Sequence, residues 1–201
     1  MKRFDQIAGS WDAKERRIIL AENIFKAIES KINFNNDMNV IDIGAGTGLL
    51  LFHFPELVKE ITGIDNSSKM LEELDKKAKI NNINNVKTLF FDAETDKLPK
   101  NEYDLAVSSM TFHHILHYEK FMTDVYNSLK KGGIICIADL ETEDGSFHTN
   151  KFDDVKYLGF DITDFNTKLK NAGFKNTEVE IIFEIDRHNK KYPIFLAYGE
   201  K

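Results

Sequence analysis

The sequence contains one cysteine, three prolines and no long apolar run among its 201 residues. A single cysteine excludes a disulfide within the chain and a zinc site built from thiolates. Cys136 lies in the apolar run 134–138, which predicts a buried structural thiol. No stretch approaches the roughly 20 apolar residues of a membrane span, and residues 1–10 lack the apolar core of a secretory signal. We therefore expect no membrane partner and a cytoplasmic location.

An excess of basic residues is also absent. Lysine and arginine number 27 against 33 aspartates and glutamates, and the two signs are interspersed. Because a nucleic-acid backbone is bound through clustered basic side chains, this balance disfavours binding to bulk nucleic acid. Hydrophobic residues make up 42% of the chain, which is enough for one substantial core. We predict a single domain over residues 1–201.

Apolar runs that fit strands alternate with segments of helical periodicity along most of the chain. Strands are predicted at residues 40–43, 60–65, 86–91, 103–109, 134–139, 177–185 and 192–198. Helices are predicted at residues 13–31, 49–54, 67–80, 118–130 and 164–172, with a polar loop over residues 141–161. The alternation predicts an α/β fold with a parallel sheet covered by helices on both faces, and the last two strands form an antiparallel pair at its edge.

The turn after the first predicted strand reads Asp-Ile-Gly-Ala-Gly-Thr-Gly at residues 42–48. Glycines at alternating positions let the backbone pass close to a ligand at the carboxyl end of a parallel sheet. A dinucleotide fingerprint places its third glycine three residues after the second, whereas Gly48 follows Gly46 by two. This spacing disfavours a nicotinamide cofactor and favours a ligand without phosphates that carries a nucleoside and an amino acid.

The next two predicted strands end in acidic residues, Asp65 and Asp92. With the turn at 42–48 and Leu-Lys-Lys-Gly-Gly at 129–133, these segments resemble the ordered motifs of class I S-adenosylmethionine-dependent methyltransferases. The resemblance covers most of residues 36–140. It implies a Rossmann-like seven-stranded sheet in the order 3-2-1-4-5-7-6 with strand 7 antiparallel, and S-adenosylmethionine as cofactor with S-adenosylhomocysteine as product.

The same resemblance assigns the cofactor-binding residues. The turn at 42–48 would hold the methionine part, Asp65 the ribose, and Asp92 with Ala93 the adenine, which Met70 or Phe91 would cover. The residues assigned to the cofactor are Asp42, Gly44, Ala45, Gly46, Thr47, Gly48, Asp65, Asn66, Met70, Asp92, Ala93 and Ser108.

Residues 1–31 resemble the N-terminal cap segment and helix of methyltransferases that act on small molecules. We expect Phe4, Ile7 and Trp11 to form a lid that excludes water from the reacting sulfonium, with Met110 also facing the acceptor. The alternative for Trp11 is a purely structural contact with the following helix.

Histidines supply the candidate catalytic groups. His113, His114 and His148 are placed to remove a proton from an oxygen or nitrogen acceptor, although alignment and desolvation account for much of the rate without a base. A zinc site is disfavoured because His113 and His114 are expected to point apart on a helix, which leaves only His113 and His117 on one face. No metal is expected.

These patterns predict methyl transfer to a small or medium metabolite, with oxygen, nitrogen and carbon acceptors all open. One alternative is a non-catalytic protein or partner subunit that binds S-adenosylmethionine or S-adenosylhomocysteine. Another, a nicotinamide oxidoreductase, is disfavoured by the glycine spacing. The expected partner is a small-molecule acceptor of unassigned identity, and the chain is expected to be a monomer or a homodimer.

Overall fold

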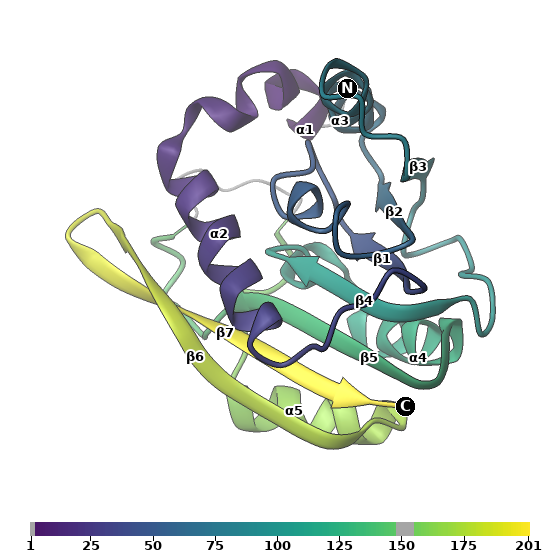
Figure 1. Ribbon diagram of the computed structural model, residues 1–201. Helices are drawn as coiled ribbons and strands as arrows, with labels where there is room; N and C mark the ends of the chain where they lie inside the picture. The colour runs from purple at the N-terminus through teal and green to yellow at the C-terminus, as the bar shows by residue number, and fades with distance from the viewer. Residues whose placement is uncertain (1–2, 148–154) are drawn as a thin grey trace.

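The computed structural model describes residues 3–147 and 155–201, and its centre is a seven-stranded sheet (Figure 1). The strands lie in the order β3-β2-β1-β4-β5-β7-β6, and β7 runs antiparallel to both of its neighbours. Their bounds are β1 Asn39–Ile43, β2 Glu60–Asp65, β3 Val86–Phe90, β4 Tyr103–Ser109, β5 Leu129–Leu140, β6 Lys175–Arg187 and β7 Lys190–Glu200. The predicted fold class and strand order are confirmed.

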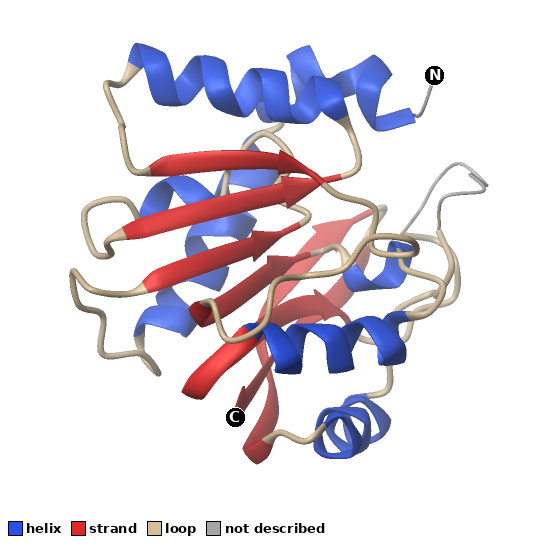
Figure 2. Ribbon diagram, turned by 90° about the vertical axis from the view of Figure 1, so that its right-hand side faces the viewer, coloured by secondary structure: helices blue, strands red, loops and turns tan. Residues whose placement is uncertain are grey.

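Helices cover both faces of this sheet (Figure 2). The α-helices are α1 Arg3–Ile7, α2 Glu15–Glu29, α3 Ser68–Ile80, α4 Tyr118–Ser128 and α5 Ile162–Ala172, and the short 3-10 helices are η1 Ala8–Ala13, η2 Leu51–His53 and η3 Phe112–His114. Val40 of β1 packs in the core shared with α2 and α3, whereas its neighbour Ile41 packs in the core shared with α4 and α5. Since successive strand residues point to opposite faces, one apolar run serves both cores.

Two predicted helices differ from the structure. Residues 49–54 form only the 3-10 turn η2, because the segment between the glycine turn and Pro55 is short. The backbone amides of His53 and Phe54 donate to the carbonyls of Leu50 and Leu51, three residues earlier. The predicted helix 118–130 ends at Ser128, and the chain then enters β5 five residues earlier than predicted, at Leu129, which pairs with β4.

The β6–β7 hairpin is long, and in Figure 1 it extends beside α2. Its turn residues His188 and Asn189 have φ angles of 52° and 58°, as expected for a two-residue hairpin turn in which both central residues take positive φ, so that the turn matches the right-handed twist of the strands. Within residues 3–147 and 155–201, no helix is long and apolar enough to cross a membrane.

Candidate functional site

A cavity of about 1020 Å³ opens at the carboxyl ends of the parallel strands. The loops that follow β1, β2, β3 and β4 line it, together with the N-terminal helices and the end of β6. This is the edge of an open α/β sheet where ligands bind, and the volume is at the upper end of the range for small-molecule sites.

The glycine-rich turn forms one wall of the cavity. The backbone amides of Gly44 and Ala45 both donate to the carbonyl of Ile64, at 2.8 and 3.0 Å, which fixes the turn against β2. Gly44 has a φ of +71°, and an added Cβ there would collide with the side chain of Thr111. Gly46 has a φ of +55° and open space where a Cβ would stand. The backbone at this wall is therefore exposed to a ligand at very close range.

Asp42, the fourth residue of β1, is buried under this turn with 1% of its surface exposed. Its Oδ2 has no hydrogen-bond partner within the part of the chain that the structure describes. Burial, and secondarily the charge of Asp65, raise the pKa of this carboxyl from 3.8 to about 8. A buried carboxyl with an unmet acceptor atom suits a cationic or hydrogen-bond-donating group of a ligand.

Asp65 ends β2 and holds the turn in place. Its Oδ2 accepts from the Gly46 amide at 2.9 Å, and its Oδ1 accepts from the Ser67 amide at 2.8 Å. A carboxylate offers about four acceptor positions, so these two backbone bonds do not exclude further hydrogen bonds from ligand hydroxyls. Asp92, after β3, likewise lines the cavity while its Oδ1 accepts from the Glu94 amide at 3.0 Å.

The N-terminal segment is fastened to the elements around the turn by two acidic residues. Asp5 accepts from the hydroxyl of Ser67, the N-cap of α3, at 2.6 Å. Asp12 accepts from the Thr47 hydroxyl at 2.6 Å and pairs with Lys77 at 2.6 Å. These contacts place residues 4–12 over the cavity.

Two aromatic rings of this segment line the cavity. Phe4 meets Trp11 edge-on with ring centroids 5.7 Å apart, and it meets His114 at 5.3 Å. The guanidinium of Arg17 lies 3.4 Å from the Trp11 ring centroid and donates to the Trp11 carbonyl. Trp11 therefore contacts the following helix and also lines the cavity, and its predicted role as a lid stays a prediction.

A buried histidine–carboxylate pair lies beside the cavity, which His113 helps to line. His113 Nδ1 is 2.6 Å from Asp139 Oδ1, and the two side chains are 2% and 0% exposed. The His113 amide donates to Asp139 Oδ2 at 3.2 Å, and the Leu140 amide donates to Oδ1 at 2.7 Å. An ionised carboxylate can only accept, so a hydrogen bond from His113 to such a group places a proton on Nδ1.

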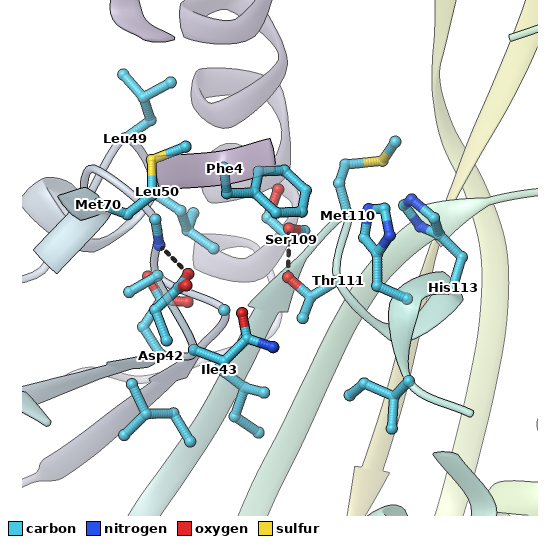
Figure 3. Close-up of a pocket in the computed structure, with 18 of the residues that line it drawn as sticks. Phe4, Asp42, Ile43, Leu49, Leu50, Met70, Ser109, Met110, Thr111 and His113 are labelled. Atoms are coloured by element: carbon cyan, nitrogen blue, oxygen red, sulfur yellow. Dashed lines mark hydrogen bonds between the residues drawn. The ribbon is translucent and has the colours of Figure 1, made fainter. Parts of the chain in front are cut away.

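In Figure 3, Asp42 and Met70 lie at one end of the cavity and Met110 and His113 at the other, with Phe4 between them in this view. The prediction that His113 and His114 point apart is wrong. Both belong to the tight turn η3 rather than to an α-helix, and their ring centroids are 4.1 Å apart.

Most of the predicted site residues line this one cavity. They are Phe4, Trp11, Asp42, Gly44, Ala45, Gly46, Thr47, Asp65, Asn66, Met70, Asp92, Ala93, Met110, His113 and His114.

Ile7, Gly48 and Ser108 are not among the lining residues. The Ser108 hydroxyl donates to the carbonyl that ends β1, at 2.9 Å, and its neighbour Ser109 faces the cavity instead. His148 lies outside the described residues. The ligand roles assigned to these positions stay predictions.

Sequence reasoning missed two features of the site. Asp139 was not recognised as the partner of His113, although His113 follows β4 and Asp139 lies at the carboxyl end of the adjacent parallel strand β5. A set of basic residues on the cavity wall was also missed: Lys14, Arg16, Arg17, Lys156 and Arg187. Across residues 3–147 and 155–201, no three histidine, cysteine or acidic side chains are grouped to hold a metal ion.

Comparisons with known proteins agree with this geometry. A methyltransferase-domain family model matches residues 15–179. An uncharacterised methyltransferase of Schizosaccharomyces pombe is 30% identical over 156 residues, covering 71% of this chain and 55% of that protein.

Two solved structures share the fold. A SAM-dependent methyltransferase from Aquifex aeolicus superposes with a TM-score of 0.73 at 18% identity, covering 98% of this chain and 97% of that one. A methyltransferase solved in complex with the Haloferax volcanii Trm112 methyltransferase activator gives 0.81 at 15% identity, covering 100% and 98%. The chain spans about half the length of the curated relatives it matches.

Proposed function

The chain belongs to the S-adenosylmethionine-dependent methyltransferases, and from that premise we propose that it methylates an oxygen or nitrogen of a small or medium-sized metabolite held beside His113. One observation carries this proposal: a single cavity joins the glycine-rich turn above Asp42 to the buried His113–Asp139 pair. A methyl donor and a methyl acceptor can therefore lie in one cavity, where alignment and exclusion of water would accelerate transfer.

The residues around the turn fit the cofactor. When bound, S-adenosylmethionine supplies a methyl group on a positively charged sulfur, which is a strong electrophile. We assign Asp42 to the amino group of the methionine part, because its buried Oδ2 needs a donor. Asp65 is assigned to the ribose hydroxyls, and Asp92 with Ala93 to the adenine edge, with Met70 as apolar cover.

His113 is assigned the role of general base. An acceptor O–H or N–H loses its proton on methylation, and a neutral imidazole whose Nδ1 is bonded to Asp139 takes that proton at Nε2. Asp139 is a positioning residue: it fixes the tautomer and ring orientation of His113 and stabilises the imidazolium that forms. Tight backbone bonds from His113 and Leu140 hold its carboxylate in turn.

Ligand-induced stabilisation tests the cofactor half of this proposal. S-adenosylmethionine and S-adenosylhomocysteine are expected to raise the melting temperature, because a ligand at 100 times its Kd adds about 2.7 kcal/mol to the stability of the folded chain. NAD and NADP should leave the melting temperature unchanged. A shift with NAD alone would contradict the assignment. Release of S-adenosylhomocysteine in an acceptor screen then separates catalysis from binding without turnover.

Two variants test the catalytic half. His113→Gln is expected to lower kcat by about 10²- to 10⁴-fold with little change in the affinity for S-adenosylhomocysteine. Asp139→Asn leaves the imidazole present but removes its anionic partner. The midpoint of the pH profile of kcat should therefore move, and the maximum kcat should fall. His188→Gln, at an exposed histidine in the β6–β7 turn that does not line the cavity, is the matched control. Unchanged pH profiles in both site variants would rule out a base at His113.

A further inference from the structure

The loop that follows β3 folds into a tight turn at the cavity wall. The Asp92 amide donates to Asp96 Oδ2 at 2.8 Å, the Glu94 amide donates to Asp92 Oδ1 at 3.0 Å, and the Asp96 amide donates to the Asp92 carbonyl at 2.8 Å. Asp92, Ala93 and Glu94 all line the cavity. Because these bonds close on one another within residues 92–96, a ligand that holds Asp92 also restricts Glu94.

The Glu94 carboxylate bonds to the segment that connects η3 to α4. Its Oε1 accepts from the Leu116 amide at 2.6 Å and from the His117 amide at 3.4 Å. α4 begins at Tyr118 and has no side-chain cap of its own, so an acidic group at this end also interacts favourably with the positive end of the helix dipole. Leu116 and His117 line the cavity, and the contact therefore lies at its wall.

The segment that Glu94 holds also carries His113. The His113 carbonyl accepts from the amides of Lys156 and Tyr157, at 2.9 and 3.1 Å, and the Tyr157 hydroxyl donates to the Leu116 carbonyl at 2.7 Å. The backbone around His113 is therefore held from two directions. Of these contacts, the one with Glu94 comes from the loop assigned to the cofactor.

We propose that Glu94 is a positioning residue that couples the cofactor to the acceptor site. A ligand at Asp92 and Ala93 holds the turn that carries Glu94, and Glu94 in turn holds the segment that carries His113. This inference rests on the proposed function, because it assigns a role to a residue of that same site. The bond from Glu94 is exposed and loses side-chain freedom when it forms, and a ligand that already restricts the turn lowers this cost. Because such coupling is reciprocal, bound cofactor tightens the binding of the acceptor.

A second link between the same loop and α4 provides an internal comparison. Lys97 pairs with Asp124 in the body of the helix at 2.7 Å, and the lysine side chain is 62% exposed. Exposed ion pairs of this kind contribute little. Lys97→Gln removes this link but leaves the Glu94 carboxylate and its two amide partners in place. It is therefore the matched control for attachment of the loop to the helix.

Amide hydrogen exchange, followed residue by residue with NMR, tests the coupling without a known acceptor. In the parent protein, saturating S-adenosylhomocysteine should slow exchange of the Leu116 and His117 amides about 3- to 10-fold, which corresponds to strengthening one hydrogen bond to a charged group. In Glu94→Ala the ligand should no longer slow these amides. Glu94→Gln keeps an acceptor oxygen and should restore most of the effect, and Lys97→Gln should behave as the parent does.

Calorimetry distinguishes positioning from direct contact with the cofactor. Linkage requires Glu94→Ala to weaken S-adenosylhomocysteine binding by about the same factor by which the ligand slows exchange in the parent protein. A loss of affinity well above that factor would show that Glu94 binds the cofactor itself and would overturn the proposal.

Three outcomes of the exchange measurement would also overturn it. They are equal slowing in the parent and in Glu94→Ala, a Glu94→Gln variant that behaves like Glu94→Ala, and loss of the effect in Lys97→Gln. A parent protein that binds S-adenosylhomocysteine without slower exchange at Leu116 would contradict the coupling and leave methyl transfer intact. Failure of the parent protein to bind S-adenosylhomocysteine would instead refute the proposed function.

Discussion

Replacement of Asp42 by asparagine should make the ligand-free protein more stable and the cofactor bind more weakly. Burial raises the pKa of this carboxyl from 3.8 to about 8, so below pH 8 the folded chain holds a proton that the unfolded chain releases above about pH 4. Stability therefore falls as pH rises through this window, by about 1.4 kcal/mol per pH unit for one proton. The full penalty is on the order of 5 kcal/mol at pH 8.

The Asp42→Asn variant removes the ionisation but still has to bury an amide, so we expect it to recover about 1–3 kcal/mol at pH 8. For a chain of this size that corresponds to a rise in melting temperature of roughly 2–10 °C. Below pH 4 the variant and the parent should have similar stabilities, because the carboxyl is neutral in both folded and unfolded chains there. Thermal melting between pH 4 and pH 9 measures the difference.

The binding half of the prediction uses calorimetry with S-adenosylhomocysteine. Loss of a charge-assisted hydrogen bond should weaken its binding by about 10- to 100-fold. If the ligand's amino group pairs with the ionised carboxylate, binding at pH 7 releases close to one proton, and buffers of different ionisation enthalpy reveal it. The variant should release none. Asp37→Asn, an exposed site with the same charge change, is the control. A variant that is less stable at pH 8 and binds with unchanged affinity and proton release would refute the reasoning.

Three further substitutions have distinct expected outcomes. Asp65→Ala should weaken S-adenosylhomocysteine binding about 10- to 100-fold, and an unchanged calorimetric affinity would refute the ribose assignment. The substitution should also lower the melting temperature of the ligand-free protein, because two backbone amides lose their acceptor. Gly44→Ala should destabilise the fold by about 1–3 kcal/mol in chemical denaturation, because its φ is positive and the new methyl group collides with Thr111. Trp11→Ala should raise the KM for the acceptor several-fold more than it changes the Kd of S-adenosylhomocysteine; an unchanged KM in steady-state kinetics would leave the ring a structural role in its contacts with Phe4 and Arg17.

The features that sequence alone predicted are those encoded within short segments. The glycine turn is recognisable because its positive φ angles fall on glycines within residues 44–48, and strand alternation follows from the period of apolar residues. The strand order was inferred from the family resemblance rather than from residues, and it is confirmed. The predicted end of the helix before β5 was wrong because Leu129 has no local signal that separates a buried helical end from a strand paired with β4.

The features that it did not predict depend on distant segments meeting. Asp139 partners His113 because β4 and β5 run parallel with Ser109 opposite Ala138, and that register is a property of the sheet. Arg17 and Arg187 share a cavity only because the hairpin lies beside α2. The sequence likewise could not predict that Asp42 Oδ2 has no hydrogen-bond partner within the described residues. An aspartate in an apolar strand is equally compatible with a carboxylate that is paired.

The N-terminal segment connects the two halves of the cavity. Asp5 and Asp12 attach it to α3 and to the glycine turn, which are elements of the cofactor half. Phe4 and Trp11 of the same segment contact His114 and Arg17, which also line the cavity. Because one short segment makes both sets of contacts, the rings of Phe4 and Trp11 are positioned in part by Asp5 and Asp12, which bind elements of the cofactor half.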